Sequence, residues 1–157
     1  MVSVAVLCIG MVTGGFACAD DVPEVSPVGE IYGAVLAALV AEQPVATTAP
    51  GAMPVVYVAP LDKRYRIGLG DQAEVLERLR LVVDVRFVDD RAEAIDDKRP
   101  ERPVRDGAVL VELGPVINEK DGYSLHLRRS GDVTVPQERS AVVTRADGTW
   151  AVVLGAR

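Results

Sequence analysis

The chain has 157 residues, of which 49% are hydrophobic and 25% charged, and its net charge is −6 at neutral pH. This balance is that of a globular protein and excludes wholesale disorder. The acidic excess argues against nucleic acid or an anionic membrane face as the main partner, because binding to either needs clustered Lys and Arg.

The first 19 residues are predicted to be a leader for export. Residues 1–16 are apolar or small and carry no charge. The run is too short for a membrane span, which needs about 20 residues, but it is typical of a secretory signal. Ala17-Cys18-Ala19 supplies a small-x-small cleavage site and places the mature start at Asp20. Residues 20–25 follow as a tether, and residues 26–157 are expected to form a single α+β domain.

A second route uses the same residues. Gly15-Phe16-Ala17-Cys18 resembles a bacterial lipobox, in which the cysteine is lipidated and becomes the first mature residue, although Leu is usual where Gly15 stands. No Lys or Arg precedes the apolar run, which departs from the usual pattern of a signal. A buried N-terminal strand or helix of the domain itself is the third alternative. We expect a protein that is secreted, or anchored by a lipid on Cys18, outside the cytoplasm. The only other cysteine, Cys8, also lies in the leader, so the mature domain is expected to have no thiol or disulfide chemistry.

Two helices are predicted first. One begins at Ser26-Pro27, with the serine as N-cap, and ends before Pro44. A second helix follows Asp71, with Glu74 completing a capping box. Residues 91–97 are expected to form one or two further turns, capped by Asp89 or Asp90. The apolar stripe of the first helix consists of Ile31, Tyr32, Val35, Leu36, Leu39 and Val40.

Short apolar or alternating segments predict the strands, and Asp147-Gly148 between the last two is a strong hairpin signal. The expected strands are residues 55–59, 83–87, 108–113, 123–129, 139–145 and 149–154. We therefore predict an α+β fold, with N-terminal helices packed on a curved, mostly antiparallel sheet.

No motif assigns a reaction, and the catalytic residues stay unknown. The only histidine, His126, lies between two leucines on a predicted strand, so its side chain faces away from theirs. As a general base it would need an orienting carboxylate. Trp150 is expected to anchor the core or to line a ligand site. The candidate ligand-binding residues are Tyr123, His126 and Trp150.

Metal and cofactor sites are not expected. One histidine without a mature-domain cysteine excludes a structural zinc site. The four aspartates of residues 89–97 lack the spacing and the glycine of a calcium loop. Gly68-Leu69-Gly70-Asp71 lacks the third glycine of a phosphate-binding turn and is interpreted as a helix cap. The basic residues of segment 98–105 are offset by acidic ones, so nucleic acid is not expected to bind there.

Several segments are similar to those of uncharacterised small exported proteins and lipoproteins of GC-rich bacteria. The closing Asp-Gly-x-Trp strand and the leading helix also resemble the cystatin-like and nuclear-transport-factor-2-like roll folds. That resemblance implies a sheet with a concave face, but such folds host enzymes, binding modules and scaffolds alike. The similar segments are residues 31–36, 55–58, 85–89, 107–115 and 148–152.

The leading hypothesis is a non-enzymatic envelope domain that binds a small ligand or another envelope protein, and touches the membrane only through its leader or lipid. The alternative is a hydrolase or isomerase that uses the concave face, with His126 and a carboxylate such as Glu112 or Asp89. An immunity or stress protein that acts through its surface is a third possibility.

Overall fold

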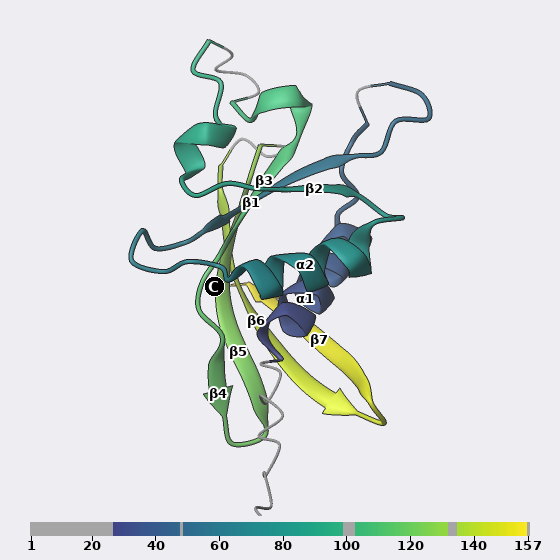
Figure 1. Ribbon diagram of the computed structural model, residues 1–157, viewed down its shortest axis with the longest axis vertical. Helices are drawn as coiled ribbons and strands as arrows, with labels where there is room; N and C mark the ends of the chain where they lie inside the picture. The colour runs from purple at the N-terminus through teal and green to yellow at the C-terminus, as the bar shows by residue number, and fades with distance from the viewer. Residues whose placement is uncertain (1–26, 48, 99–102, 132–134, 157) are drawn as a thin grey trace, which may run out of the picture.

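The computed structural model describes residues 27–47, 49–98, 103–131 and 135–156, so the expected leader, tether and Ser26 lie outside the described residues. In these ranges, two α-helices pack on one sheet whose strand order is β2-β1-β3-β5-β6-β7, with β4 beside β5 (Figure 1). Within these ranges, no helix has both the length and the apolar character needed to cross a bilayer.

The structure confirms the α+β class and the mostly antiparallel sheet, since β2 and β3 pair parallel with β1 and every other pairing is antiparallel. The helical elements are α1 (Val28–Glu42), α2 (Leu69–Leu79) and two 3-10 turns, η1 (Arg91–Ala94) and η2 (Arg105–Gly107). The strands are β1 (Val55–Pro60), β2 (Asp84–Phe87), β3 (Val109–Leu113), β4 (Ile117–Glu119), β5 (Gly122–Ser130), β6 (Gln137–Ala146) and β7 (Thr149–Ala156).

The main core lies between the helices and one face of the sheet. Alternate residues of the strands point to this face because the side-chain period of a strand is two. Val56 and Val58 of β1, for example, belong to the same buried cluster as Leu36 and Leu39 of α1. On the opposite face, a smaller cluster around Tyr57 and its neighbours covers only part of the sheet.

Two predictions about helix ends have different outcomes. The first helix ends at Glu42, before Pro44, as expected. The second begins at Leu69 with Gly68 as N-cap and no side-chain cap, so the predicted Asp71–Glu74 capping box is wrong. Asp71 is the third residue of α2, too far inside to cap its first N–H groups. A capping box occurs instead at Asp90 and Glu93 of η1, which confirms Asp90 as the cap of that turn.

The strands predicted from apolar alternation are found in the structure, and the two sets of bounds differ only at the strand ends. The Asp147-Gly148 hairpin is confirmed, and both residues have positive φ, of 51° and 77°, as the tight turn requires. The short strand β4 was not predicted, since its three residues are all exposed and leave no pattern of burial.

Candidate functional site

The structure brings two of the three candidate ligand-binding residues together. The rings of Tyr123 and Trp150 meet edge to face, with centroids 5.8 Å apart. Both are half-buried against the main core, and Trp150 Nε1 donates a hydrogen bond to Glu30 Oε2 at 2.7 Å. The Arg145 guanidinium lies 5.1 Å from the centre of the Trp150 ring. These contacts are those of a structural anchor between the last strand and α1.

The third candidate, His126, lies on the other face of the sheet. Its neighbours Leu125 and Leu127 are buried in the main core, whereas His126 is exposed. Across the described part of the chain, its imidazole makes no hydrogen bond or ion pair. A binding site made of all three residues is therefore not assembled on one surface.

Neither carboxylate named with His126 contacts it. The side chain of Glu112 is 4% exposed, and its Oε2 lies 3.5 Å from guanidinium nitrogens of both Arg91 and Arg128. Asp89 pairs with Arg66 at 3.1 Å. In the described ranges, no three His, Cys, Asp or Glu side chains gather as metal ligands. The hydrolase alternative has no supporting geometry at this histidine.

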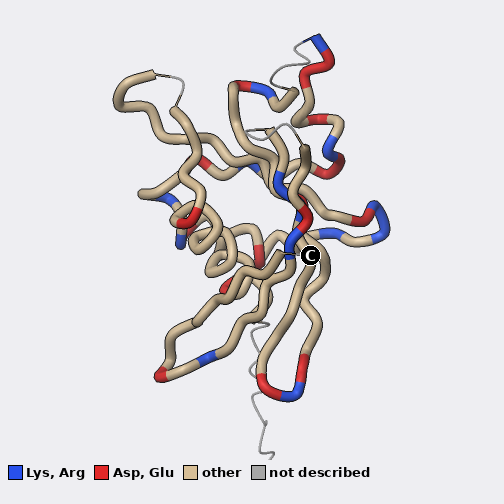
Figure 2. Tube along the Cα trace, turned by 180° about the vertical axis from the view of Figure 1, so that it is seen from behind, with Lys and Arg blue, Asp and Glu red and all other residues tan. Residues whose placement is uncertain are grey.

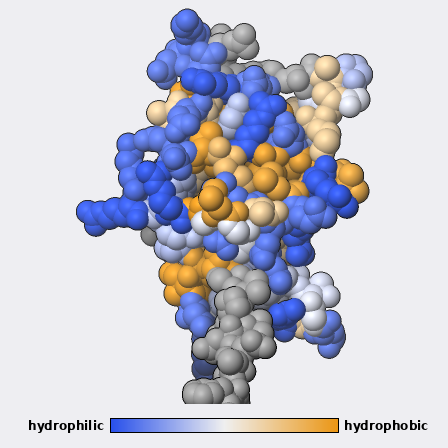
Figure 3. Space-filling view, in the orientation of Figure 1, coloured by the Kyte–Doolittle hydropathy of each residue, from blue (hydrophilic) through white to orange (hydrophobic). Residues whose placement is uncertain are grey.

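A groove of about 680 Å³ lies beside β2, where the sequence suggested no site. Figure 3 shows apolar surface gathered over this region, between β2 and α2. Leu76 of α2 and Met53 of the segment before β1 are each 43% exposed there. The lining residues are Ala52, Met53, Val55, Leu76, Arg80, Val83, Asp84, Val85, Arg86 and Asp106.

The groove follows the free edge of β2. The N–H of Asp84 donates to Pro54 O and the N–H of Val88 to Val58 O, both at 2.9 Å. Every second residue from Asp84 to Val88 therefore directs its backbone groups toward β1. The N–H and C=O groups of Val85 and Phe87 consequently point away from the sheet. Because Val85 and Arg86 lie on opposite faces of β2 and both line the groove, the hollow runs along the strand's edge.

One rim of the groove is charged. Arg86 donates hydrogen bonds of 2.8 Å to Asp84 Oδ2 and to Asp106 Oδ2, and Tyr57 OH donates to the same Asp106 oxygen at 2.9 Å. The hydrogen bonds with Tyr57 and Asp84 raise the pKa of Arg86, which keeps this guanidinium charged.

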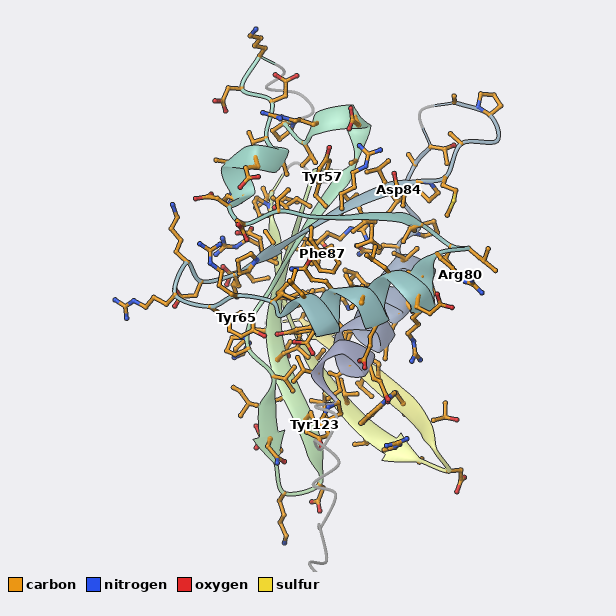
Figure 4. The ribbon with its side chains drawn as sticks, in the orientation of Figure 1. Tyr57, Tyr65, Arg80, Asp84, Phe87 and Tyr123 are labelled. Atoms are coloured by element: carbon orange, nitrogen blue, oxygen red, sulfur yellow. The ribbon has the colours of Figure 1, made fainter. Side chains whose placement is uncertain are left out.

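Asp106 is held in the left-handed region, at φ 59° and ψ 14°, which is costly for a residue with a side chain. Its carboxylate is anchored by the hydrogen bonds from Tyr57 and Arg86. In Figure 4, Arg80 and Asp84 mark one end of this region, Phe87 lies between β2 and α2, and Tyr123 lies far from them.

A second pocket, of about 390 Å³, lies where η1 faces the end of β5. Its lining includes Ile95, Pro103, Ser130 and Pro136, together with Arg91. It contains none of the three candidate ligand-binding residues. Ser130 is 4% exposed.

Comparison of the chain with protein-family models, with curated proteins and with solved structures finds no match. What defines the class of this protein is its own architecture: an α+β domain whose open-edged sheet carries a groove along β2.

Proposed function

We propose that this protein is a non-enzymatic binding domain of the bacterial envelope, exported through its leader and either free or anchored by a lipid on Cys18. It binds an extended segment of another envelope protein along β2. The observation that carries this proposal is the groove that opens beside the unpaired backbone of that strand.

The bound segment adds one strand to the sheet. The N–H and C=O groups of Val85 and Phe87 supply the main-chain hydrogen bonds, which give affinity in this mode of recognition. Side chains of the bound segment alternate between two surfaces. One set packs on Met53 and Leu76, and the other faces the charged group around Arg86.

The apolar surface favours a protein segment over a small ligand. A volume of 680 Å³ falls within the range of about 300–1,000 Å³ that ligand sites occupy. The apolar surface does not stop at the groove, however. Leu81 and Val82, in the turn between α2 and β2, are 85% and 51% exposed. A partner longer than a small molecule is needed to cover them.

Selection of peptides from a random phage-displayed library on the purified protein tests this proposal. The matched pair of variants is Leu76→Glu, inside the groove, and Leu69→Glu, seven residues earlier on α2 and outside the lining. We expect enriched peptides with alternating apolar residues whose binding falls at least tenfold in L76E and is retained in L69E. Peptides that bind both variants as well as the wild type would contradict the groove as the site.

The export half of the proposal has its own test. Mass spectrometry of the protein recovered from envelope fractions determines the mature N-terminus. A start at Asp20 indicates simple cleavage, and a lipid-modified Cys18 indicates anchoring. An intact, unmodified Met1 in the cytoplasm would contradict export while leaving the binding proposal standing.

A further inference from the structure

The second edge strand of the sheet, β7, carries none of the features that keep edge strands from pairing. Strand β7 has eight residues, Thr149–Ala156, with no charged residue and no proline, and it ends the strand order. Proteins protect exposed edges with charges, prolines or short strands, so β7 is an edge open to pairing. Figure 2 shows the β6–β7 hairpin with little charge along its length.

The tight turn at Asp147-Gly148 decides which groups of β7 are free. In a two-residue hairpin, the residues that flank the turn form a hydrogen-bonded pair, here Ala146 and Thr149. The alternate residues Trp150, Val152 and Leu154 therefore direct their N–H and C=O groups away from β6. Among these groups, within the described part of the chain, Leu154 O accepts a long 3.4 Å hydrogen bond from Arg139 Nη2.

Helix α1 lies along the same edge and is apolar on nearly all sides. Its first turn is joined to Trp150 through Glu30, and its last turn to Arg139 through Glu42, at 2.8 and 3.2 Å. Between these two glutamates α1 carries no charge. A helix that packs one face on a core usually shows a polar opposite face, whereas the outer side of α1 shows alanines such as Ala41. The apolar surface thus continues from the edge onto the helix.

We propose that β7 pairs antiparallel with β7 of a second copy of this chain, about a two-fold axis at Val152. The two sheets then become one continuous sheet, and the two α1 helices lie side by side on it. Trp150 of one copy pairs with Leu154 of the other, and Ala151 with Val153, so each pairing joins uncharged residues. An isologous contact of this kind closes as a dimer.

The charged side chains that the structure places at the two ends of the edge balance one another. Glu30 and Arg145 lie at the Trp150 end, and Glu42 and Arg139 at the Leu154 end. The two-fold axis sets one end of each copy against the opposite end of the other. Two ends that each carry one carboxylate and one guanidinium then meet, although the chain as a whole is acidic. These four side chains therefore bring no excess of like charge to either end of the contact with a second copy.

Sedimentation equilibrium of the full chain over a concentration series tests the dimer. We expect twice the mass of one chain for the wild type. The double variant A151K/V153K should be a monomer, because each lysine would stand directly opposite a lysine of the second copy. The matched control V142K/T144K places the same two charges at the paired positions of β6, one strand inward, and should stay a dimer.

A second variant separates loss of pairing from loss of folding. V152P removes an N–H group that points to the free edge, so the β6–β7 ladder keeps its hydrogen bonds. We expect V152P to be monomeric, with the circular dichroism spectrum of the wild type and unchanged peptide binding at β2. A wild type that is monomeric at every concentration, or a dimer that persists in both A151K/V153K and V152P, would overturn the inference.

Discussion

The indole N–H of Trp150 reaches Glu30 Oε2 at 2.7 Å, which connects the last strand to the first helix across 120 residues of chain. Together with the pair between Glu42 and Arg139, this contact fixes both ends of α1 beside β7. Trp150 therefore helps to hold the helix that flanks the proposed dimer edge. This position favours the anchor interpretation of Trp150 over a ligand contact.

Replacement of Trp150 measures how much its hydrogen bond to Glu30 contributes to stability. We expect W150F to lower the free energy of unfolding by about 1–2 kcal/mol, because the smaller phenyl ring keeps only part of the packing and the hydrogen bond to a carboxylate is lost. A double-mutant cycle with E30A, followed by urea denaturation, separates the hydrogen bond from packing. A coupling energy of about 1 kcal/mol is expected. Strictly additive losses would show that the two side chains do not act together.

Tyr32 should make the stability depend on alkaline pH. Its hydroxyl donates to Gly114 O at 2.8 Å and lies 2.6 Å from the hydroxyl of Tyr65. Burial and the hydrogen bond with Tyr65 raise the pKa of Tyr32 above its ordinary value. In the unfolded chain the pKa of tyrosine is about 10. The protonated Tyr32 hydroxyl therefore stabilises the fold fully below pH 10, and this stabilisation is lost as the pH rises further.

The variant Y32F removes the titrating group. At pH 8 we expect it to be less stable than the wild type by about 1–3 kcal/mol, because the Gly114 carbonyl loses its donor. Urea denaturation between pH 8 and 11 should show the two stabilities converging above pH 10. Parallel curves would mean that Tyr32 does not cause the alkaline loss. Y65F, which keeps the bond to Gly114, should lose less than Y32F at pH 8.

Replacement of Glu112 should cost less stability than replacement of the two arginines that pair with it. The Glu112 side chain is 4% exposed, whereas those of Arg91 and Arg128 are 42% and 30% exposed and can turn to water. E112L is therefore expected to cost at most about 1 kcal/mol, since it leaves no charge buried. The double variant R91A/R128A strands a buried carboxylate and should cost about 3 kcal/mol. Thermal and urea denaturation compare them, and equal losses would contradict the asymmetry.

Substitution by alanine should change the stability differently at Gly29 and at Gly33, although both glycines lie in α1 against α2. A Cβ at Gly29 would come within 2.8 Å of the Asp71 Cα, which is backbone and cannot move aside. At Gly33 it would meet Arg78 Cδ, part of a flexible side chain, at 2.7 Å. We expect G29A to destabilise by about 1–3 kcal/mol through overpacking.

G33A is the control for that substitution. The higher helix propensity of alanine contributes up to about 1 kcal/mol and offsets the shift of Arg78, so the net change is expected to be small. Urea denaturation measures both variants. If G29A proved as stable as the wild type, the two helices would not be held at the distance that the structure shows.

Local sequence signals predicted most of the elements, because they act over a few residues. Neighbouring residues alone decide three of these features: the end of α1 before Pro44, the apolar alternation of β2 around Asp84, and the Asp147-Gly148 turn. The start of α2 was mistaken because Asp71 and Glu74 have cap-like spacing, while glycine at position 68 leaves no side-chain signal of its own. The groove was missed for a different reason: it combines residues from three separate parts of the chain.

By itself, the sequence determined the α+β class, the apolar strands and an uncharged last strand, since periodicity and composition decide these. Only the tertiary structure decided which strands became edges. The crossover through α2 places β2 at one side of β1, and β3 inserts on the other. Such pairings depend on packing between segments far apart in the chain. They leave β2 and β7 open, and with them the two surfaces at which this protein is proposed to bind.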